Sequence, residues 1–531
     1  MKAEVVVIGA GVNGLTTAAL LARTGLKPVV LERRSRVGGA AVTEEFHPGF
    51  KASTVAHTAG PFRASLIEEF GLARKGLSFI DAEPRVFAPL PDGRGLSLWG
   101  DPQQTAAGLS SLSAKDAQAW PGFHANLGRL SAVLSRVLSV TPPDLDEPSL
   151  AQAWPFLGIG IDFRRLGRKD GQNLLRWGPM AVADFVQEWF STPLLQAVIA
   201  ARGVHGAFAG PWSAGTTANL LLHAATSGGN GAGSTVFVKG GLGALTEALA
   251  AAARSFGAEI RTGAEVSQIL TKDGAASGVV LAGGEEIMAR AVVSAVDLPR
   301  TFLRMLDPAL LDPEDVRRVR NFRIQGMASK VNFALSGLPA FPGQRGADAA
   351  TALRGRIHIG ADIDALERAF DAAKYGEPSP RPYLDLTIPS ITDPALAPPG
   401  QHVLSAYVQY TPYRLKTGSW KDRSDEVAAS TVKLLEEYAP GFSSLVLGRQ
   451  VLTPLHLEET YGLTCGHPSH GEPALDQLFV TRPLLGWARY RSPIAGLYLC
   501  GAGTHPGGGV TGGPGQNAAR EIAKDLRRTR V

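Results

Sequence analysis

Two short apolar runs begin the chain, and a segment rich in small residues separates them. The runs are Val5–Ile8 and Val29–Leu31, followed by a glycine and by an acidic residue respectively. Continuous apolar runs of this length are typical of buried strands, and the segment between them favours a helix. The pattern therefore predicts a strand–helix–strand unit at the start of the chain.

Three glycines and one carboxylate stand where such a unit binds a dinucleotide. Gly9, Gly11 and Gly14 have GxGxxG spacing, which provides a tight turn, room for a pyrophosphate and close packing of helix on strand. The start of the helix adds free N–H groups and the positive end of its dipole. Glu32 closes the second run and is placed to accept hydrogen bonds from an adenosine ribose. The alternative is a glycine-rich turn that holds no ligand.

An RxGG sequence follows the second run, with Arg36 before Gly38 and Gly39. It is similar to the continuation found in flavoproteins related to glutathione reductase and amine oxidase, where the glycine pair runs along the FAD diphosphate. The resemblance implies FAD as the cofactor, and we include Arg33 with these glycines among the expected cofactor contacts. The alternative is a surface turn with solvated arginines.

The composition is that of an ordinary globular protein. Its 531 residues suffice for several domains, and 44% of them are hydrophobic while 19% are charged. The net charge of +5 is mildly basic, and no interleaved aromatic and basic stripe indicates nucleic-acid binding. The charge leaves contact with an anionic membrane surface open.

Only two cysteines occur, Cys465 and Cys500, and they form no CxxC or CxxxxC pair. We therefore expect no disulfide scaffold, no cysteine metal site and no flavin–dithiol relay, and we predict that both thiols lie in the core. No apolar run reaches the roughly 18 residues of a membrane span, and the first strand starts too early for a signal peptide. A cytoplasmic protein is expected, with membrane association open.

Later segments return to the nucleotide-binding fold, so we predict an α/β class chain with two interleaved domains. GAEIRTGAEV and ARAVVSAVD supply further strands, and the C-terminal sequence indicates a strand, a glycine loop and a helix. Residues 1–75, 230–300 and 490–531 are assigned to a discontinuous FAD-binding domain of Rossmann type. Residues 76–229 and 301–489 are assigned to an α+β substrate domain, whose sheet includes SKVNFALSG and HVLSAYVQY.

A second glycine cluster, in KGGLGALTEALAAAARS, could be mistaken for another dinucleotide turn. No suitable apolar strand precedes it and no acid closes the next strand. We therefore predict a structural helix start at residues 240–243.

The segment RRLGRK (Arg164–Lys169) precedes an aromatic-rich helical region, LLRWGPMAVADFVQEWF. One interpretation is a set of core helices with a solvated basic loop. The other is a peripheral membrane foot beside the entrance for a lipophilic substrate.

The loop Gly501–Gly515 is too rich in glycine for an ordinary connection, and it leads directly into a helix. A helix start aimed at the flavin would stabilise the anion formed on two-electron reduction. We therefore expect cofactor contacts from Gly501, Gly503, Thr511 and Gly512. The alternative is a flexible surface loop. Such a glycine-rich loop would lose much conformational entropy if it became ordered without binding a ligand.

The two ends of the chain resemble the phytoene desaturase superfamily. GHPSHGEPALDQLFVTRP followed by LYLCGAGTHPGGGVTG is similar to the C-terminal signature of bacterial phytoene desaturases. The middle of the chain most resembles the phytoene-dehydrogenase-related group, through AGPWSAGT, GRIHIG and AAKYGEPSPRPYLDLTIPSITDPALAPPGQHVLSAYVQY. The resemblance covers essentially the whole chain and implies an FAD-linked amine-oxidase and carotenoid-desaturase fold. It also implies that the backbone of Val266 contacts the adenine.

Flavin dehydrogenation needs an oriented C–H bond and a group that handles a proton. Lys330 is the first candidate, because a lysine in an otherwise apolar strand is costly to bury, and its place is similar to that of the lysine near the flavin in amine oxidases. An exposed strand face is the alternative. His505 in the glycine loop is the second candidate, with a role in shaping the loop as its alternative.

Three further polar residues, Glu472, Asp476 and Gln477, flank the same cavity in the resemblance, with a cap or turn role as the alternative for Asp476. His467 and His470 lack a third ligand at metal spacing, so no metal is expected.

Three functions are consistent with these features. The first is an FAD-dependent oxidoreductase that moves hydride between a C–C bond of a lipophilic, isoprenoid- or polyene-like substrate and the flavin, in either direction. Its electrons would pass to oxygen, a quinone or another carrier, because no separate NAD(P) domain is evident. The second is a C–N oxidase, and the third is a non-catalytic FAD-bound regulatory or interaction protein. Self-association is left open.

Overall fold

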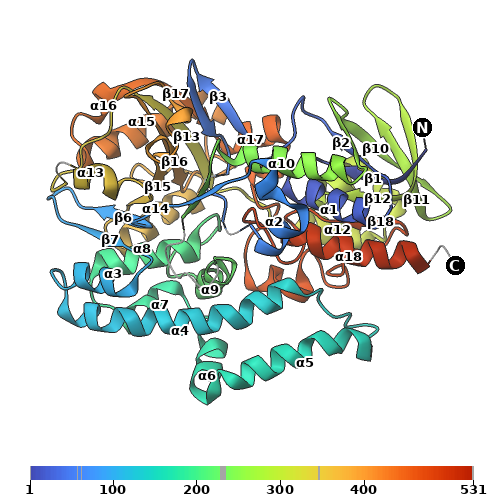
Figure 1. The fold of residues 1–531 in the computed structure, drawn as a ribbon, viewed down its shortest axis with the longest axis horizontal. Coiled ribbons are helices and arrows are strands. Elements are labelled where there is room, and N and C mark those ends of the chain that lie inside the picture. Colours follow the sequence, from blue (N-terminus) through green and yellow to red (C-terminus); the bar gives the residue numbers. More distant parts are fainter. Residues whose placement is uncertain (1, 57, 61, 228–234, 345–346, 529–531) are drawn as a thin grey trace.

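The computed structural model describes residues 2–56, 58–60, 62–227, 235–344 and 347–528. Two seven-stranded sheets dominate these residues and lie side by side, and a layer of helices runs beneath the second sheet (Figure 1).

The first sheet contains the predicted strand–helix–strand unit. Its parallel part has the order β9, β2, β1, β12, β18, and the antiparallel strands β11 and β10 extend it beyond β12. The bounds are β1 (Lys2–Ile8), β2 (Pro28–Glu32), β9 (Glu259–Thr262), β10 (Val266–Lys272), β11 (Ala275–Leu281), β12 (Glu286–Ser294) and β18 (Leu497–Leu499). The strands expected from GAEIRTGAEV, ARAVVSAVD and LYLCG are thereby confirmed.

Both faces of this sheet are buried. Val5 and Val7 of β1 pack with α1 (Val12–Arg23), α10 (Leu242–Ser255) and α18 (Gly513–Arg528). Val6 and Ile8 point to a second core on the opposite face. Alternate side chains of a strand point to opposite faces, so a run that is apolar at every position fits a sheet covered on both sides.

The second sheet has one apolar and one polar face. Its order is β17 (Val446–Leu452), β13 (Ala328–Leu335), β16 (His402–Gln409), β15 (Tyr383–Thr387), β14 (Arg356–Ile359), β6 (Val86–Pro89) and β7 (Gly95–Leu98). Val331, Phe333, Leu404 and Leu386 pack in a core that includes residues of α15 (Trp420–Tyr438). The intervening positions, which include Lys330, present polar side chains on the other face.

Helices from the middle of the chain pack together on this polar face. They are α4 (Ala114–Ser139), α7 (Val182–Trp189), α8 (Pro193–Val204) and α9 (Thr216–Thr226). Helix α8 contacts the strands directly through Arg202 and Val204. Helices α5 (Leu150–Arg165) and α6 (Gly167–Trp177) lie below α4, at the edge of the molecule (Figure 1). The remaining elements are β3 (Thr43–His47), β4 (Phe50–Ser53), α2 (Ala64–Phe70), β5 (Phe79–Asp81), α3 (Pro102–Leu109), β8 (Val236–Val238), α11 (Leu298–Arg300), α12 (Pro313–Asn321), α13 (Ala347–Ala352), α14 (Ile363–Lys374), α16 (Phe442–Leu445) and α17 (Pro454–Tyr461).

The second glycine cluster starts α10, as predicted, and the structure shows how its N-terminus is satisfied. Gly243 N donates to the Thr43 hydroxyl at 2.9 Å, and Leu242 N donates to the Ser53 hydroxyl at 3.0 Å. These side chains occupy donors that a phosphate would otherwise use, so this helix start is structural.

The domain boundaries themselves stay a prediction, and the one near residue 230 lies outside the described residues. Among the helices that the structure describes, none combines the length and the apolar character that crossing a bilayer requires.

Candidate active site

The GxGxxG turn is built as its spacing predicts. Gly9 has a φ of +97°, which favours glycine, and its N–H donates to Leu31 O at 2.8 Å. A Cβ at Gly14 would lie 2.1 Å from Gly9 O, so only glycine lets helix α1 pack against the turn. A Cβ at Gly11 would meet no protein atom within 4 Å, because Gly11 borders a cavity. The turn therefore leaves open space where a pyrophosphate is expected.

The RxGG glycines pack directly on this turn. Gly38 N donates to Ala10 O at 2.9 Å, and a Cβ at Gly39 would lie 3.2 Å from the Cα of Gly11. Both glycines line the same cavity as Gly11. The two glycine motifs thus form one continuous wall.

The carboxylate of Glu32 lies beside this wall and is held by backbone. Its Oε2 accepts from Ala10 N at 2.9 Å and its Oε1 accepts from Arg34 N at 3.0 Å. Each oxygen keeps a further lone pair for a ligand hydroxyl. Arg33 and Val266 also line the cavity, and the Arg33 guanidinium donates to the carbonyl oxygens of Glu459 and Thr460.

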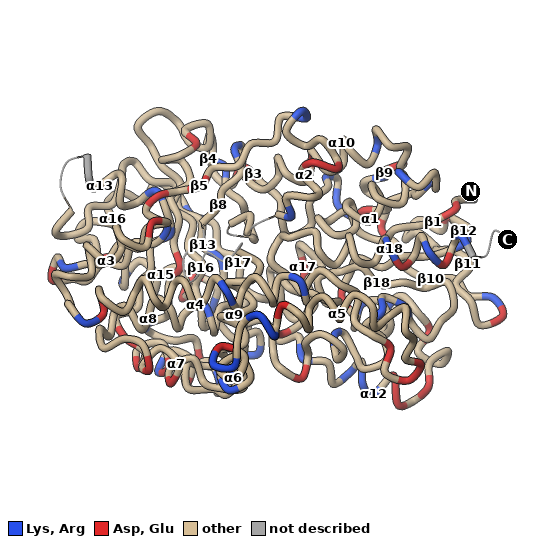
Figure 2. Tube along the Cα trace, turned by 60° about the horizontal axis from the view of Figure 1, so that its bottom comes forward, with Lys and Arg blue, Asp and Glu red and all other residues tan. Residues whose placement is uncertain are grey.

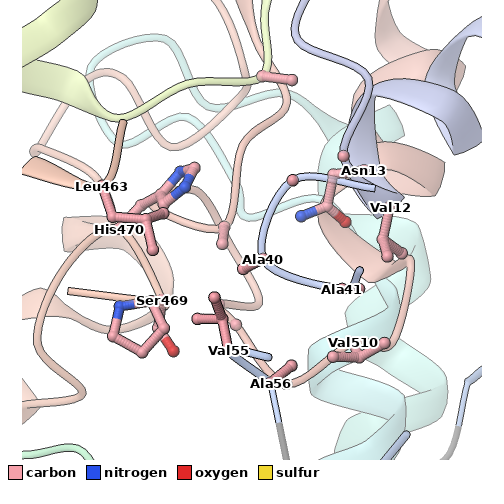
Figure 3. Close-up of a pocket in the computed structure, with 18 of the residues that line it drawn as sticks. Val12, Asn13, Ala40, Ala41, Val55, Ala56, Leu463, Ser469, His470 and Val510 are labelled. Atoms are coloured by element: carbon pink, nitrogen blue, oxygen red, sulfur yellow. The ribbon is translucent and has the colours of Figure 1, made fainter. Parts of the chain in front are cut away.

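The cavity has a volume of about 560 Å³ and joins the first sheet to the polar face of the second. Figure 3 shows Val12 and Asn13 of the first turn on one side and Leu463, Ser469 and His470 on the other, with Ala40 and Val55 among the residues between them. The expected FAD fits these residues, because open glycine backbone, a helix start and a buried carboxylate line one end of one large cavity.

The C-terminal loop supplies another wall of the cavity, through Ala502 and the stretch from Pro506 to Thr511. Three of the predicted contacts, Gly501, Gly503 and Gly512, do not line it. A Cβ at each of these glycines would lie 2.8 Å from an atom of a neighbouring residue, which is Ala295, His470 and Leu66 respectively. These glycines therefore permit close packing of the loop. Thr511 does line the cavity, and its hydroxyl accepts from Gly513 N at the start of α18.

At the second sheet, a buried carboxylate lies between two arginines. Asp385 Oδ2 accepts from Arg202 at 2.6 Å and from Arg356 at 3.1 Å. Arg202 also donates to the hydroxyl of Tyr383 at 2.9 Å. Arg202, Arg356 and Asp385 all line the cavity, and the Asp385 side chain is 2% exposed.

Three aromatic rings lie next to this cluster and line the cavity as well. The ring of His205 stacks on Tyr407, with centroids 4.5 Å apart, and the ring of His223 lies 5.9 Å from that of His205. Burial, and then the charge of Arg202, lowers the pKa of His223 to about 4, and the same causes lower that of His205 well below its usual value. Both imidazoles are therefore neutral at pH 7.

Lys330 is buried beside this cluster, with 2% exposure, so the alternative of an exposed strand face is wrong. Burial lowers the pKa of Lys330 to about 7, although the charge of Asp385 opposes the shift. Lys330 does not itself line the cavity but lies next to Tyr407, which does. Its part in the chemistry stays a prediction.

His505 also lies outside the cavity lining and is 1% exposed. Its Nε2 is 3.3 Å from Val137 O, and its carbonyl accepts from the hydroxyl of Tyr490. Burial lowers the pKa of His505 to about 3, so the ring is neutral. These contacts favour a role in shaping the loop, and a catalytic role stays a prediction.

The polar residues of the GEPALDQ segment face away from the cavity and bind Arg323. Asp476 forms a bidentate pair with this guanidinium, Glu472 accepts from its Nε, and Gln477 exchanges hydrogen bonds with its backbone. Their neighbours Gly471, Pro473 and Leu478 line the cavity instead. Among the residues that the structure describes, no three His, Cys, Asp or Glu side chains gather into a metal-binding group.

The cluster around Asp385 was missed in the sequence, although the sequence carried a signal for part of it. Arg356 in RIHI and Asp385 in YLDLT are charged residues that alternate with Ile or Leu in short strands, a feature close to the one that singled out Lys330. Arg202, His205 and His223 had no such signal, because they lie on helices, or next to one, where a polar residue is ordinary.

Comparison with known proteins agrees with this geometry. The family described as "Flavin containing amine oxidoreductase" matches residues 197–523, and the "NAD(P)-binding Rossmann-like domain" family matches residues 7–69. A rat protein named "Pyridine nucleotide-disulfide oxidoreductase domain-containing protein 2" is 38% identical, over 99% of this chain and 94% of its own.

Two bacterial proteins are more distant relatives over almost the full length. A limonene dehydrogenase subunit of Castellaniella defragrans is 27% identical, over 99% of this chain and 95% of its own. "Phytoene desaturase (neurosporene-forming)" of Rhodobacter capsulatus is 25% identical, over 97% of this chain and 93% of its own. Among solved structures, cyclohexylamine oxidase from Brevibacterium oxydans shares the fold, with a TM-score of 0.58 and 17% identity over 99% of this chain and 100% of that one.

Proposed function

This chain belongs to the flavin-containing amine oxidoreductase family, and we propose that it oxidises, or in reverse reduces, a C–C bond of a lipophilic substrate. It is an FAD-dependent oxidoreductase of the phytoene desaturase-like superfamily. The observation that carries the proposal is the single cavity that joins the glycine turns of the first sheet to the buried face of the second. A substrate bound in such a cavity would lie beside the cofactor and away from bulk water.

The residues that would hold FAD are those of the two glycine motifs, Glu32, Val266 and the wall from Pro506 to Thr511. When bound, FAD supplies a two-electron acceptor for hydride. The protein orients the substrate and handles the proton that leaves the adjacent carbon. We assign this proton to the group formed by Tyr407 and Lys330, since Lys330 has a pKa near 7 and exchanges protons readily at neutral pH.

A lipophilic substrate is supported by the apolar residues of the lining. Val55, Leu138, Leu222, Leu463 and Leu478 contribute aliphatic side chains to the cavity. They offer a chain of carbon atoms a surface free of competing hydrogen-bond donors.

C–C chemistry, rather than C–N oxidation, is supported by the aromatic residues. Among the described residues of the lining, the phenol rings are those of Tyr407 and Tyr461. Tyr461 donates to Glu44 and lies against the guanidinium of Arg34, while Tyr407 stacks on His205. Neither arrangement makes the facing aromatic pair that favours an amine, and two of the relatives are named as a desaturase and a dehydrogenase.

Anaerobic reduction of the bound flavin tests this function. The FAD-loaded protein is mixed with an isoprenoid or polyene and, separately, with primary and secondary amines, while the flavin absorbance is followed. Bleaching by the isoprenoid or polyene alone is the expected result. Bleaching by amines alone would establish C–N oxidation instead. A stably loaded flavin that no donor bleaches, and that an unsaturated isoprenoid does not reoxidise after chemical reduction, would indicate a non-catalytic protein.

We also propose that helix α5 rests on an anionic membrane surface. Leu150, Trp154, Leu157 and Ile161 are exposed and follow one another at helical spacing along one face, and Leu150 is 92% exposed. The basic residues Arg164, Arg165, Arg168 and Lys169 are also exposed where α5 meets α6, and Figure 2 shows this basic cluster at α6. An apolar stripe next to a basic cluster complements a bilayer that contains anionic lipid.

A further inference from the structure

We propose that the substrate carries a carboxylate, and that this group binds beside Arg202 and Arg356 at the second-sheet end of the cavity. The inference rests on the proposed function and names the polar part of its substrate. A lipophilic acid, with its carbon chain along the aliphatic lining, would satisfy both proposals.

The first argument is the balance of charge at this end of the cavity. Two guanidinium groups, from Arg202 and Arg356, share one carboxylate oxygen, Oδ2 of Asp385. Asp385 is the only acidic side chain from α8, α9 and the second sheet among the described residues that line the cavity. Because arginine stays protonated in proteins, at least one positive charge is left over among these three side chains, and Lys330, buried beside Asp385, adds to it when protonated.

The second argument is that this surplus charge is buried. The side chains of Arg202, Arg356 and Asp385 are 12%, 5% and 2% exposed. A buried charge is costly unless a partner offsets it, and one carboxylate cannot fully offset two guanidiniums. Burial, and then the charge of Arg202, lowers the pKa of Arg356, while the charge of Asp385 opposes this shift and raises the pKa of Arg202.

The third argument is that the surplus charge faces the cavity instead of being sealed in the core. Both arginines line it, together with His205, His223 and Asn219, whose side chains offer further hydrogen bonds. Arg202 and His205 lie one helical turn apart and therefore on the same side of the chain. A ligand that enters the cavity meets an electropositive wall with several donors.

Above pH 7, where Lys330 is mostly neutral, the surplus is a single charge, which favours a carboxylate over a phosphate group. A carboxylate carries one negative charge and matches the planar guanidinium with two parallel hydrogen bonds. A phosphate monoester carries nearly two charges at neutral pH, which would leave a negative charge buried in place of the positive one.

Binding of matched probes to the FAD-loaded protein tests the inference. Hexanoate, decanoate and tetradecanoate are titrated beside their methyl esters and beside decyl phosphate, and binding is read from the flavin absorbance spectrum and from thermal stabilisation. We expect at least one acid to bind about tenfold or more tightly than its ester. Equal affinities for acids and esters, no binding of any acid, or preference for the phosphate would each overturn the proposal.

Substitutions at Arg202 separate a ligand contact from a purely structural ion pair. Arg202→Gln should weaken binding of the acid about tenfold or more while leaving that of the ester unchanged, and Arg202→Lys should recover part of the loss. Arg381→Gln is the matched control, because Arg381 makes a bidentate pair with Glu437 at an exposed site outside the cavity lining. If Arg202→Gln weakened acid and ester equally, or lost its FAD, Arg202 would not be a carboxylate contact.

The two proposals can fail separately in these experiments. Acids that bind tightly without bleaching the flavin would sustain the carboxylate site and count against C–C oxidation of the acids tested. Bleaching by a neutral isoprenoid, with acids bound no better than their esters, would sustain C–C oxidation and overturn the carboxylate site.

Discussion

Lys330 lies directly opposite Tyr407 in the antiparallel pairing of β13 and β16. Residues paired in this way project from the same face of a sheet, so the lysine and the phenol are neighbours on the polar face. Tyr407 pairs in turn with Asp385 on β15. The cavity therefore meets Tyr407 and Asp385 directly, and Lys330 lies one side chain behind them.

Replacing Lys330 with methionine should slow reduction or reoxidation of the flavin while the FAD content stays intact. The change removes a group that exchanges protons near pH 7, and loss of a proton-handling group costs about a hundredfold in rate. Stopped-flow absorbance measures both half-reactions. Lys421→Met, at a side chain that is 71% exposed, is the control, and unchanged rates in Lys330→Met would remove the lysine from the mechanism.

Lys330 should also make stability depend on pH. Its pKa of about 7 in the folded protein lies below the ordinary value of 10.5, so between these values the unfolded chain binds one more proton than the folded one. Stability must then rise with pH across this window, by about 1.4 kcal/mol per unit at most. The free energy of unfolding of wild type and of Lys330→Met can be measured in urea at several pH values between 7 and 9.5. As pH rises, the free energy of wild type should increase relative to that of Lys330→Met. A difference independent of pH would show that the lysine is charged in the folded state throughout.

The nucleotide-binding end of the molecule could be predicted from the sequence because its determinants are local. Gly9, Gly11, Gly14 and Glu32 lie within one strand–helix–strand unit. A Cβ at Gly14 would clash with the carbonyl oxygen of Gly9 inside that unit, and Gly9 has the positive φ that the turn from strand to helix requires. These requirements can be inferred from the spacing of the motif.

The cluster around Asp385 could not be predicted in this way. Arg202 lies on α8, Arg356 on β14 and Asp385 on β15, and only the strand order and the docking of α8 on the sheet bring them together. Their pairing is a tertiary result that no local pattern contains.

In this helical region, the core-helix interpretation applies to α7, whereas the apolar face that is left exposed belongs to α5. Val182, Phe185 and Val186 of α7 are buried in the core, as the core-helix interpretation requires. Helix α5, just before the basic segment, has no buried residue at all. The exposed apolar face therefore lies before RRLGRK and not in the aromatic-rich sequence after it, because composition does not show which apolar face is buried; the membrane foot itself stays a prediction.

Glu32→Ala should weaken retention of FAD, because it removes the carboxylate expected to bind the ribose hydroxyls. Loss of charged hydrogen bonds of this kind costs roughly tenfold or more in affinity. The ratio of flavin to protein after gel filtration measures the effect. Glu32→Gln keeps an oxygen for Ala10 N and tests whether the carboxylate matters beyond that contact, and Glu285→Ala is the exposed control. Full flavin loading of Glu32→Ala would refute the ribose contact.

Alanine at two neighbouring glycines should have opposite consequences. At Gly14 the new Cβ would meet Gly9 O at 2.1 Å, so the fold itself should lose about 1–3 kcal/mol or more. At Gly11 the Cβ enters open space, and its φ of −75° suits alanine, so the chain should fold normally but retain less FAD. Thermal unfolding with and without added FAD separates the two effects. A Gly11→Ala protein that binds FAD as tightly as wild type would contradict the close approach of the cofactor at this turn.

The exposed face of α5 should govern binding to anionic membranes. Trp154→Ser with Leu157→Ser should reduce sedimentation with phosphatidylserine vesicles while leaving the melting temperature unchanged, because both side chains are exposed. Arg165→Glu with Lys169→Glu should reduce it about tenfold or more, since each basic residue near such a surface contributes about 1 kcal/mol.

Two controls decide whether the membrane is the partner of this face. Tyr375→Ser, at another exposed side chain, should bind vesicles like wild type, and vesicles of phosphatidylcholine alone should bind the wild type weakly. Sedimentation velocity on the same variants reports the oligomeric state. The double variant Trp154→Ser with Leu157→Ser could instead dissociate an oligomer and leave vesicle binding unchanged. The stripe on α5 would then be an interface between copies of this chain. Apolar residues that are buried between two copies are not available to a bilayer.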